Sequence, residues 1–556
     1  MYKMKSMKYL SLLCFSMLAL QLNAQKPNAN ATVITNAKPK LVVGIMVDQM
    51  RWDYINRFKP YFTSQNGFMR FLNEGATCDN TLIPYVPTVT ACGHASVYTG
   101  SVPGINGIAG NNWFDNDKQK AVYCVDDANV SSVGVDNSAA GKMSPVNLWT
   151  STIGDEMKLA SNFRSKVIGI SIKDRGAILP AGHTADGAYW YDSKTGNFIS
   201  STYYGAQLPT WVAQYNAKHR PDSLYQLDWN LSLPKAIYEA NCDIDQNNYE
   251  STPLGKEQKG FPYSLHQFIG KDYGKIASTP YGNTLVAELA EQALSNAQLG
   301  QDNITDLLAI SFSSPDYIGH SFGPDSWETL DGYVKLDALL AQLFTSLDKK
   351  VGKGNYTVFL TADHAVANIP GFAKKHNLPG GIVIEDQIKK GLGDYIASKG
   401  LDAKLISAVR EYNVHFNHGL MDSLGITNEK LIALSTQYLQ KLPEVLQVVD
   451  ARHAATAPVP QSLRERIVNG YNPQRAGDLL ILTKSGYVDG FSTGTSHGVL
   501  YNYDAHIPFL LFGNGIKHGV VNTPTFMTDI APTITTLLGI QMPSGAIGKP
   551  VVEVLK

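Results

Sequence analysis

Short, almost continuously apolar runs recur along the chain and constrain its fold more than any other feature. The first, LVVGIMV at 41–47, stops at Asp48. Such runs are typical of strands that are buried on both faces of a parallel sheet. Further runs of this kind are found at Val167–Ile172, Leu307–Phe312, Thr357–Leu360, Leu479–Leu482 and Ile507–Phe512.

Helical patterns lie between these runs. Examples are Leu285–Ala297, Leu330–Leu347, Leu405–Tyr412 and Thr528–Leu538. Strands that alternate with helices predict an α/β fold, here an α/β/α sandwich around a mostly parallel sheet. Two stretches, about 184–280 and 365–475, fit the alternation poorly. We expect them to be insertions in a single catalytic domain that spans 40–556.

The N-terminus has the order of a secretory signal. Lysines precede the apolar run Leu10–Leu20, and the small residue Ala24 follows it. This order predicts a cleaved signal peptide over 1–24 and a flexible leader over 25–39, and so a periplasmic or extracellular protein. The apolar run is too short for a stable membrane anchor. The alternative is a buried N-terminal helix.

Composition narrows the choice of partners. The formal net charge is −1, and no stretch concentrates Lys and Arg as a nucleic-acid-binding surface would. We therefore expect a small-molecule substrate, no nucleic acid and no stable membrane anchor. The oligomeric state is open, and we expect a monomer.

Four cysteines follow the expected signal, namely Cys78, Cys92, Cys124 and Cys242. Their wide spacing excludes a CxxC zinc motif and leaves both disulfides and free thiols open.

Acidic and histidine side chains follow several of the expected strands. They are Asp48, Asp316, His320, Asp363, His364 and His497. The carboxyl ends of parallel strands meet at one edge of a sheet, so we expect these side chains to converge. Zinc accepts imidazole nitrogen and carboxylate oxygen, and six such ligands suffice for two metal ions about 3.5–4 Å apart. The pattern therefore predicts a site for two Zn²⁺ ions.

Each of these signals has a simpler interpretation when it is taken alone. Asp48 could cap a helix after its strand. Asp316 and His320 could be an ordinary i, i+4 helical pair. The dipeptide at 363–364 is a weak motif by itself. Their shared position at successive strand ends favours the metal site.

A candidate nucleophile lies between the first two strands. Thr90 precedes a plausible helix start at 91–96. Helix N-termini present free N–H groups and suit an anion. A threonine hydroxyl is a weak nucleophile until its pKa is lowered, which a neighbouring metal can do. The alternative is that Thr90 only caps the helix.

A cationic pair follows the run that begins at Val167. Lys173 and Arg175 are two residues apart, and an extended backbone would point both to one face. An Arg fork and a Lys ammonium would together balance a dianionic phosphate. The alternative is a solvated turn.

Longer motifs enclose these residues. They are VDQMRWDY (47–54), PTVTACGH (87–94), GSVPGINGIAGNNWF (100–114), SIKDRGAILPAGH (171–183), SPDYIGHSFGP (314–324), TADH (361–364) and TSH (495–497). Together they resemble the alkaline phosphatase superfamily, and more closely the PafA-type phosphate-insensitive bacterial alkaline phosphatases. The resemblance runs from about Lys40 to the C-terminal PSGAIGKPVVEV.

The resemblance implies a secreted two-zinc alkaline phosphatase that hydrolyses phosphate monoesters through a phosphothreonine at Thr90. One zinc would be held by Asp316, His320 and His497, and the other by Asp48, Asp363 and His364. Asn111 would be a phosphate-binding amide, and Lys173 and Arg175 would be the cationic pair. Ala365-Val366 departs from the glycine that relatives often carry after the histidine, which affects the expected rate and not the chemistry.

Rival functions are weighed by the same residues. A phosphodiesterase or nucleotide pyrophosphatase would share the metal ligands but usually lacks the pair at 173 and 175. A sulfatase is disfavoured because Cys92 is not in a C-x-P-x-R context. A non-catalytic binding protein would be expected to have lost a ligand or the nucleophile.

Overall fold

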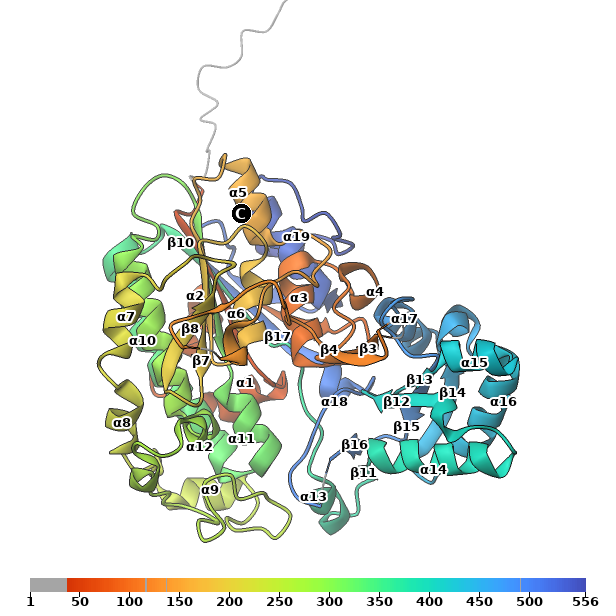
Figure 1. The fold of residues 1–556 in the computed structure, drawn as a ribbon. Coiled ribbons are helices and arrows are strands. Elements are labelled where there is room, and N and C mark those ends of the chain that lie inside the picture. The colour runs from red at the N-terminus through yellow and green to blue at the C-terminus, as the bar shows by residue number, and fades with distance from the viewer. Residues whose placement is uncertain (1–37, 116–117, 137, 491) are drawn as a thin grey trace, which may run out of the picture. The chain divides into compact units, whose positions relative to one another are not determined.

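The structure is a computed structural model that describes residues 38–115, 118–136, 138–490 and 492–556 (Figure 1). The expected signal peptide and nearly all of the expected leader lie outside these residues. Within the described ranges, no helix combines the length and the apolar character needed to cross a membrane.

The main sheet has 11 strands. In spatial order they are β18 (Gly519–Val521), β2 (Ala76–Leu82), β17 (His506–Gly513), β10 (Tyr356–Thr361), β1 (Leu41–Val47), β9 (Asp306–Phe312), β6 (Val167–Ser171), β7 (Gly187–Asp192), β8 (Asn197–Ser201) and β5 (Ser132–Val133), with β19 (Thr525–Phe526) beside β2. The five central strands from β10 to β7 are parallel, whereas β17 is antiparallel to both of its neighbours. The prediction of a mostly parallel sheet is confirmed.

Helices cover both faces of this sheet (Figure 1). One layer contains α3 (Thr90–Thr99), α5 (Ile153–Ala160), α6 (Asp174–Ala181) and α19 (Ile530–Leu538). The other contains α2 (Phe68–Glu74), α7 (Thr210–Asn216), α10 (Tyr281–Asn296) and α12 (Trp327–Leu347). Both α6 and α10 contact β6 and β9, from the two layers. The expected α/β/α sandwich is therefore confirmed.

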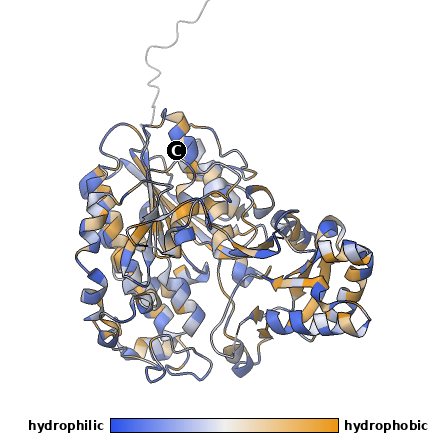
Figure 2. Cartoon of the chain, viewed as in Figure 1, coloured by the Kyte–Doolittle hydropathy of each residue, from blue (hydrophilic) through white to orange (hydrophobic). Residues whose placement is uncertain are grey.

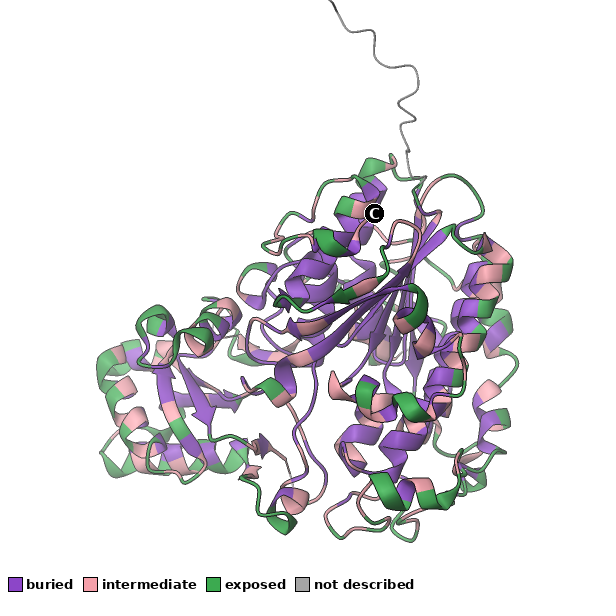
Figure 3. Ribbon diagram, turned by 180° about the vertical axis from the view of Figure 1, so that it is seen from behind, coloured by how far each residue is buried: buried purple, intermediate pink, exposed green. Residues whose placement is uncertain are grey.

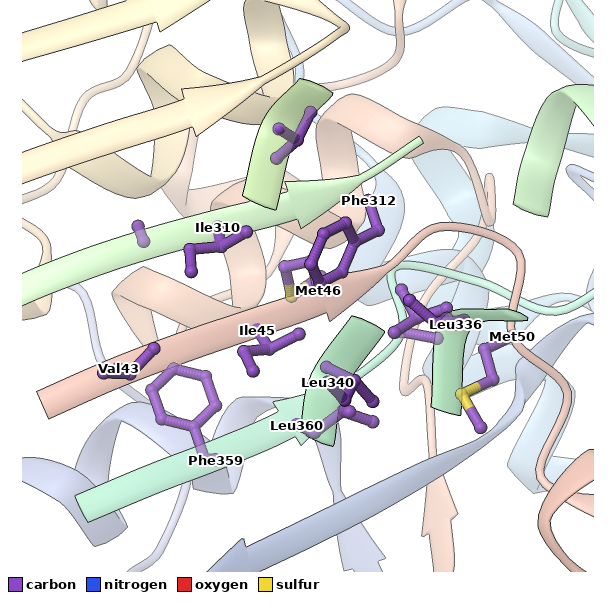
Figure 4. Packing of buried hydrophobic residues seen from close by; sticks show 14 of the residues in the cluster. Val43, Ile45, Met46, Met50, Ile310, Phe312, Leu336, Leu340, Phe359 and Leu360 are labelled. Carbon is purple, nitrogen blue, oxygen red and sulfur yellow. The ribbon is translucent and has the colours of Figure 1, made fainter. Parts of the chain in front are cut away.

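The parallel strands are buried on both faces, as their apolar runs predict. Every residue of β1 and β9 is buried. Figure 4 shows Val43 and Ile45 of β1, Ile310 of β9 and Leu340 of α12 in this core. Burying one such side chain stabilises a fold by about 1.5–3 kcal/mol. Figure 3 shows the strands of the main sheet as buried and the helices around them as partly exposed, and Figure 2 shows hydrophobic residues concentrated in these strands.

A second sheet has the order β12 (Ile406–Arg410), β13 (Asn413–Phe416), β15 (Leu479–Thr483) and β14 (Val445–Asp450), and all its pairs are antiparallel. It has its own hydrophobic cluster. The helices α14 (Glu385–Ser398), α15 (His418–Leu424), α16 (Asn428–Leu439) and α17 (Gln461–Gly470) accompany it (Figure 1). We call the residues from 381 to 489 the second lobe.

The helix expected at Leu405–Tyr412 is wrong. Residues 406–410 form strand β12, and the chain reverses at Glu411 and Tyr412 to pair with β13. The apolar positions fit a helical period, but the β-branched Ile406 and Val409 fit a strand better, and a partner strand follows directly. The run at Leu479–Leu482 is a strand, but it belongs to the second sheet. The boundaries expected for the insertions stay a prediction.

Smaller elements complete the fold. Two strand pairs are β3 (Asn112–Asp115) with β4 (Lys120–Tyr123), and β11 (Gly381–Val383) with β16 (Tyr487–Asp489). The remaining helices are α1 (Asp53–Phe58), α4 (Pro103–Asn106), α8 (Arg220–Tyr225), α9 (Lys235–Asn241), α11 (Ser314–Phe322), α13 (Pro370–Lys375) and α18 (Asn502–Ala505). The cysteines at 78, 92, 124 and 242 are free thiols.

Candidate active site

The carboxyl ends of β1, β9 and β10 bring acidic and histidine side chains to one edge of the main sheet. Asp48 directly follows β1, and its N–H donates to the last carbonyl of β9, at Phe312. Asp363 and His364 follow β10, while α11 begins two residues after β9. Asp48 caps no helix, because α1 starts only at Asp53.

His497 reaches the same edge by a different route from the expected one. The strand expected before it, at 479–482, is β15. This strand belongs to the antiparallel sheet of the second lobe and not to the main sheet. The chain instead returns from that lobe, passes His497 and enters β17 at residue 506. Because β17 is antiparallel to β10, its amino end lies beside the carboxyl ends of the parallel strands.

One group of potential metal ligands consists of Asp316, His320 and His497. Asp316 lies in the first turn of α11 and His320 in its last turn, an i, i+4 pair with 3.2 Å between Oδ1 and Nε2. Nε2 of His497 lies 3.8 Å from the same carboxylate oxygen. These three side chains therefore face a common point.

A second group consists of Asp48, Asp316 and His364. Nε2 of His364 lies 3.6 Å from Oδ1 of Asp48 and 3.5 Å from Oδ2 of Asp363. Asp316 thus belongs to both groups, and Asp363 lies at the edge of the second. All six predicted ligands converge, with Asp316 between the two groups.

The three imidazoles are held in one tautomer. Nδ1 of His320 donates to the carbonyl of Thr495 (2.7 Å), and Nδ1 of His497 to that of Thr88 (2.7 Å). Nδ1 of His364 donates to the carbonyl of Ala365 (3.0 Å). Each Nε2 is consequently unprotonated in the neutral ring and turned to the carboxylates, as a metal ligand requires.

The buried polar atoms fit a bound cation. Among the described residues, Oδ1 of Asp48, Oδ2 of Asp363 and Nε2 of His364 are buried without a hydrogen-bond partner. Buried groups of this kind are costly unless they are paired or coordinate a metal. Burial and the neighbouring carboxylates of Asp316 and Asp363 raise the pKa of Asp48. Three carboxylates and three imidazoles are the donor set that zinc accepts.

Thr90 is the first residue of α3 and is buried. The N-cap of α3 is Val89, without a side-chain capping bond, so the interpretation of Thr90 as a cap is wrong. Its Oγ1 accepts hydrogen bonds of 3.4 Å from Nζ of Lys173 and from Nη2 of Arg175. The hydroxyl is therefore free of a capping role and faces two cations.

Lys173 and Arg175 do reach one point, but not through an extended strand. Helix α6 begins at Asp174, so the chain turns between them as it leaves β6. Lys173 is buried and its Nζ lies 2.6 Å from both Asp48 Oδ2 and Asp316 Oδ2, which raises its pKa against the effect of burial. A solvated turn is therefore excluded. Nη1 of Arg175 donates to the hydroxyl of Tyr123 (3.0 Å).

Asn111 lies beside the start of α3. Its Oδ1 accepts a 2.9 Å hydrogen bond from the N–H of Ala91, which follows Thr90. The carbonyl oxygen of the side chain is thereby turned to the helix, and the NH₂ group is left to donate elsewhere. The backbone N–H of Asn111 donates to Glu411 of the second lobe (3.0 Å).

Sequence reasoning missed three residues of this site: Gln49, Tyr123 and Glu411. Gln49 lies directly after Asp48, and its Nε2 donates to Asp316 Oδ1 (2.6 Å). A polar residue next to a ligand could have been examined for this role. Tyr123 and Glu411 carry no local signal, because their partners lie far along the chain.

Comparisons with known proteins show which family the chain belongs to. The model of the family type I phosphodiesterase/nucleotide pyrophosphatase matches residues 42–499. The alkaline phosphatase PhoV of Synechococcus elongatus is 45% identical over 98% of this chain and 100% of its own length. The alkaline phosphatase PafA of Elizabethkingia meningoseptica is 45% identical over 96% of both chains.

A solved structure is similar along almost the whole chain. The crystal structure of wild-type alkaline phosphatase PafA superimposes with a TM-score of 0.91 at 45% identity, covering 93% of this chain and 99% of that one. Sequence and fold therefore agree over the regions that carry the site. The chain belongs to the type I phosphodiesterase/nucleotide pyrophosphatase family, within the alkaline phosphatase superfamily.

Proposed function

We propose that the protein is an exported alkaline phosphatase that hydrolyses phosphate monoesters through a phosphothreonine at Thr90. The observation that carries this proposal is the position of the Thr90 hydroxyl. It lies within 3.4 Å of both Lys173 and Arg175, and Lys173 in turn pairs with carboxylates of the candidate metal groups. The relatives named alkaline phosphatase support the same activity.

The cofactor is proposed to be two Zn²⁺ ions. Asp316, His320 and His497 would hold one, and Asp48, Asp363 and His364 the other, with Asp316 close to both. When bound, such ions lower the pKa of a nearby hydroxyl or water and neutralise charge on the transferring phosphoryl group. The locked tautomers and the unpartnered buried oxygens support this ligand set.

The protein residues would perform a double displacement. The Thr90 hydroxyl gives up its proton as Oγ1 bonds to phosphorus, and the ester oxygen leaves and takes up a proton as the alcohol. Water then loses a proton as it attacks phosphorus, and Oγ1 leaves and regains its proton, which releases inorganic phosphate. Lys173, Arg175 and the NH₂ group of Asn111 would bind the phosphoryl oxygens. Because the transition state of phosphoryl transfer is loose, positioning and charge stabilisation supply most of the catalysis.

The family description also names phosphodiesterases, so diester hydrolysis is the second candidate. Two cations beside Thr90 favour a monoester, whose dianion they balance better than a diester monoanion. A diester also carries a second ester substituent, which would need room near Arg175. Monoester hydrolysis is therefore the function that the site supports best.

A comparison of two substrates on the purified protein tests this proposal. Phenyl phosphate should be turned over with a higher kcat/KM than diphenyl phosphate, and elemental analysis should find two zinc ions per chain. A fully active metal-free protein, or a preference for the diester, would overturn it. N-terminal sequencing of the protein exported by its host should begin at Gln25 if the signal peptide is cleaved.

A further inference from the structure

We propose that Glu411, at the tip of the β12–β13 hairpin, is a positioning residue that fixes Asn111 in the phosphate pocket. We use this name for the proposed phosphoryl-binding site beside Thr90, which consists of Asn111, Lys173 and Arg175. The second lobe would then supply part of the pocket's framework without touching the substrate. This inference rests on the proposed function, because the position of Asn111 matters only if a phosphoryl group binds beside Thr90.

The contact between Glu411 and the pocket is direct. Oε1 of Glu411 accepts hydrogen bonds from the backbone N–H groups of Asn111 (3.0 Å) and Asn112 (3.3 Å). One oxygen that binds two successive N–H groups fixes both peptide planes.

Asn111 passes this constraint to the nucleophile. Its backbone is held by Glu411, and its Oδ1 is held by the N–H of Ala91 in the first turn of α3. Because the backbone and the side-chain oxygen of Asn111 are both held, its NH₂ group is fixed in one orientation, in which it can donate to a ligand. Loss of Glu411 would release the backbone end while the bond to Ala91 remains.

The chain around Asn111 is shaped to admit the carboxylate. A Cβ at Gly110 would overlap Oε2 of Glu411, so only glycine allows this approach. Oε2 is buried and has no hydrogen-bond partner within the described residues. The carboxyl group of Glu411 thus packs against residues 110–112, where Oε1 binds the backbone and Oε2 fills the space beside Gly110.

The hairpin turn adopts an unfavourable conformation to make this contact. Arg410 pairs with Asn413, so the turn has two central residues, Glu411 (φ 48°) and Tyr412 (φ 61°). Turns of this kind ordinarily contain Asn-Gly, because side chains disfavour positive φ. Here a hydrogen bond to α14 stabilises the turn, because the N–H of Tyr412 donates to Glu385 (2.6 Å).

The protonation state of Glu411 does not decide the role. Burial, together with nearby Glu385, raises its pKa to about 8, while the Asn112 N–H and Arg175 oppose the rise. A carboxylate, a carboxylic acid or a Gln amide each offers an oxygen that can accept from both N–H groups. Glu411→Gln should therefore preserve the function, and Glu411→Ala should not.

Steady-state kinetics of the full-length protein on phenyl phosphate test the proposal. Glu411→Ala should lower kcat/KM by about 10- to 100-fold, as a small misplacement of a binding group does. Glu411→Gln should stay within about threefold of wild type. Asn111→Ala should lower kcat/KM at least as far as Glu411→Ala, and the double variant should fall no further than Asn111→Ala, because coupled residues are not additive.

Three controls separate positioning from general damage. Asp422→Ala removes an exposed acid of α15 in the same lobe and should leave kcat/KM unchanged. Glu385→Ala loosens the turn that presents Glu411, so any loss of kcat/KM should run through the same contact and be non-additive with that of Asn111→Ala. If Glu411→Ala fails to fold, Gly110→Ala displaces the carboxylate instead and should likewise be non-additive with Asn111→Ala.

The outcomes distinguish this inference from the proposed function. Wild-type kinetics for Glu411→Ala, or full additivity with Asn111→Ala, would overturn the positioning role alone. Unchanged monoester turnover in Asn111→Ala would remove Asn111 from phosphate binding, and the positioning role with it, whereas absence of monoester turnover in the wild type would overturn the proposed function. An inhibition constant for inorganic phosphate that rises in Glu411→Ala and returns in Glu411→Gln would support the role independently of turnover.

Discussion

The side-chain amide of Gln49 donates a 2.6 Å hydrogen bond to Oδ1 of Asp316, the carboxylate that belongs to both candidate metal groups. The backbone N–H of the same residue donates to Oδ1 of Asp363 (3.0 Å). Gln49 therefore joins the ends of β9 and β10 to the end of β1. It does so with a positive φ of 65°, which is unfavourable for a residue with a side chain.

Gln49→Ala should weaken zinc binding by about 10- to 100-fold, as the loss of a partner behind metal ligands does. Competition with a zinc chelator measures this directly. Gln49→Gly should lose the same affinity but unfold at a higher temperature than Gln49→Ala, because glycine tolerates the positive φ. Equal zinc affinity in wild type and both variants would refute the role.

Gly319→Ala should reproduce the zinc defect of Gln49→Ala. Gly319 lies between the two candidate ligands of α11, Asp316 and His320, and a Cβ there would overlap Oε1 of Gln49. Gly332→Ala in α12 is the matched control, since its Cβ would lie 3.5 Å from Ile318, an ordinary contact. If both variants bind zinc as wild type does, the Gln49 side chain can shift away from the added methyl group without loss of affinity, and the packing argument is wrong.

Thr90→Ala should lose nearly all monoester turnover and still bind phosphate, because it removes only the attacking oxygen. Thr90→Ser keeps a hydroxyl and should retain part of the activity. Mass spectrometry after rapid acid quench should find a phosphorylated peptide that contains residue 90 in wild type and not in Thr90→Ala. A wild-type rate in Thr90→Ala would show that another group attacks phosphorus.

Lys173→Ala and Arg175→Ala should each lower kcat/KM for phenyl phosphate by about 100-fold or more, as the loss of a charge-stabilising donor does. The effect on diphenyl phosphate should be smaller, because a diester carries less charge. The ratio of the two substrates is therefore the measurement. A ratio that does not change would separate these cations from monoester preference.

Glu385→Gln should stabilise the protein more at pH 8 than at pH 5. Burial raises the pKa of Glu385 to about 7, with Asp489 adding to the rise and Arg410 opposing it. The unfolded state loses this proton near pH 4.5, so the free energy of unfolding falls as pH rises to about 7 and then stays low. Thermal unfolding of both proteins across this range checks the sign; a constant difference would contradict it.

Much of the site could be predicted because its signals are local. An apolar run that stops at Asp48 or before Asp363 marks a buried strand and its carboxyl end within a few residues of sequence. The neighbouring motifs then placed Thr90 and Lys173 near the same edge. These inferences need only the rule that parallel strands end together.

The parts that could not be predicted depend on contacts between distant segments. The strand at 406–410 was expected to be a helix because its apolar spacing suits both, and only pairing with β13 decides between them. That error concealed the hairpin that presents Glu411. Likewise, the antiparallel direction of β17, which brings His497 to the site, follows from its neighbours β10 and β2 and has no signature of its own.

The route of the chain to His497 also orders events during synthesis. A ribosome delivers Asp48 early, but the imidazole at 497 emerges only after the whole second lobe has been made. An unfinished polypeptide can therefore gather no more than part of the first ligand group. Metal binding by the first group would therefore be a late step of maturation, whereas the second group is complete once residue 364 has emerged.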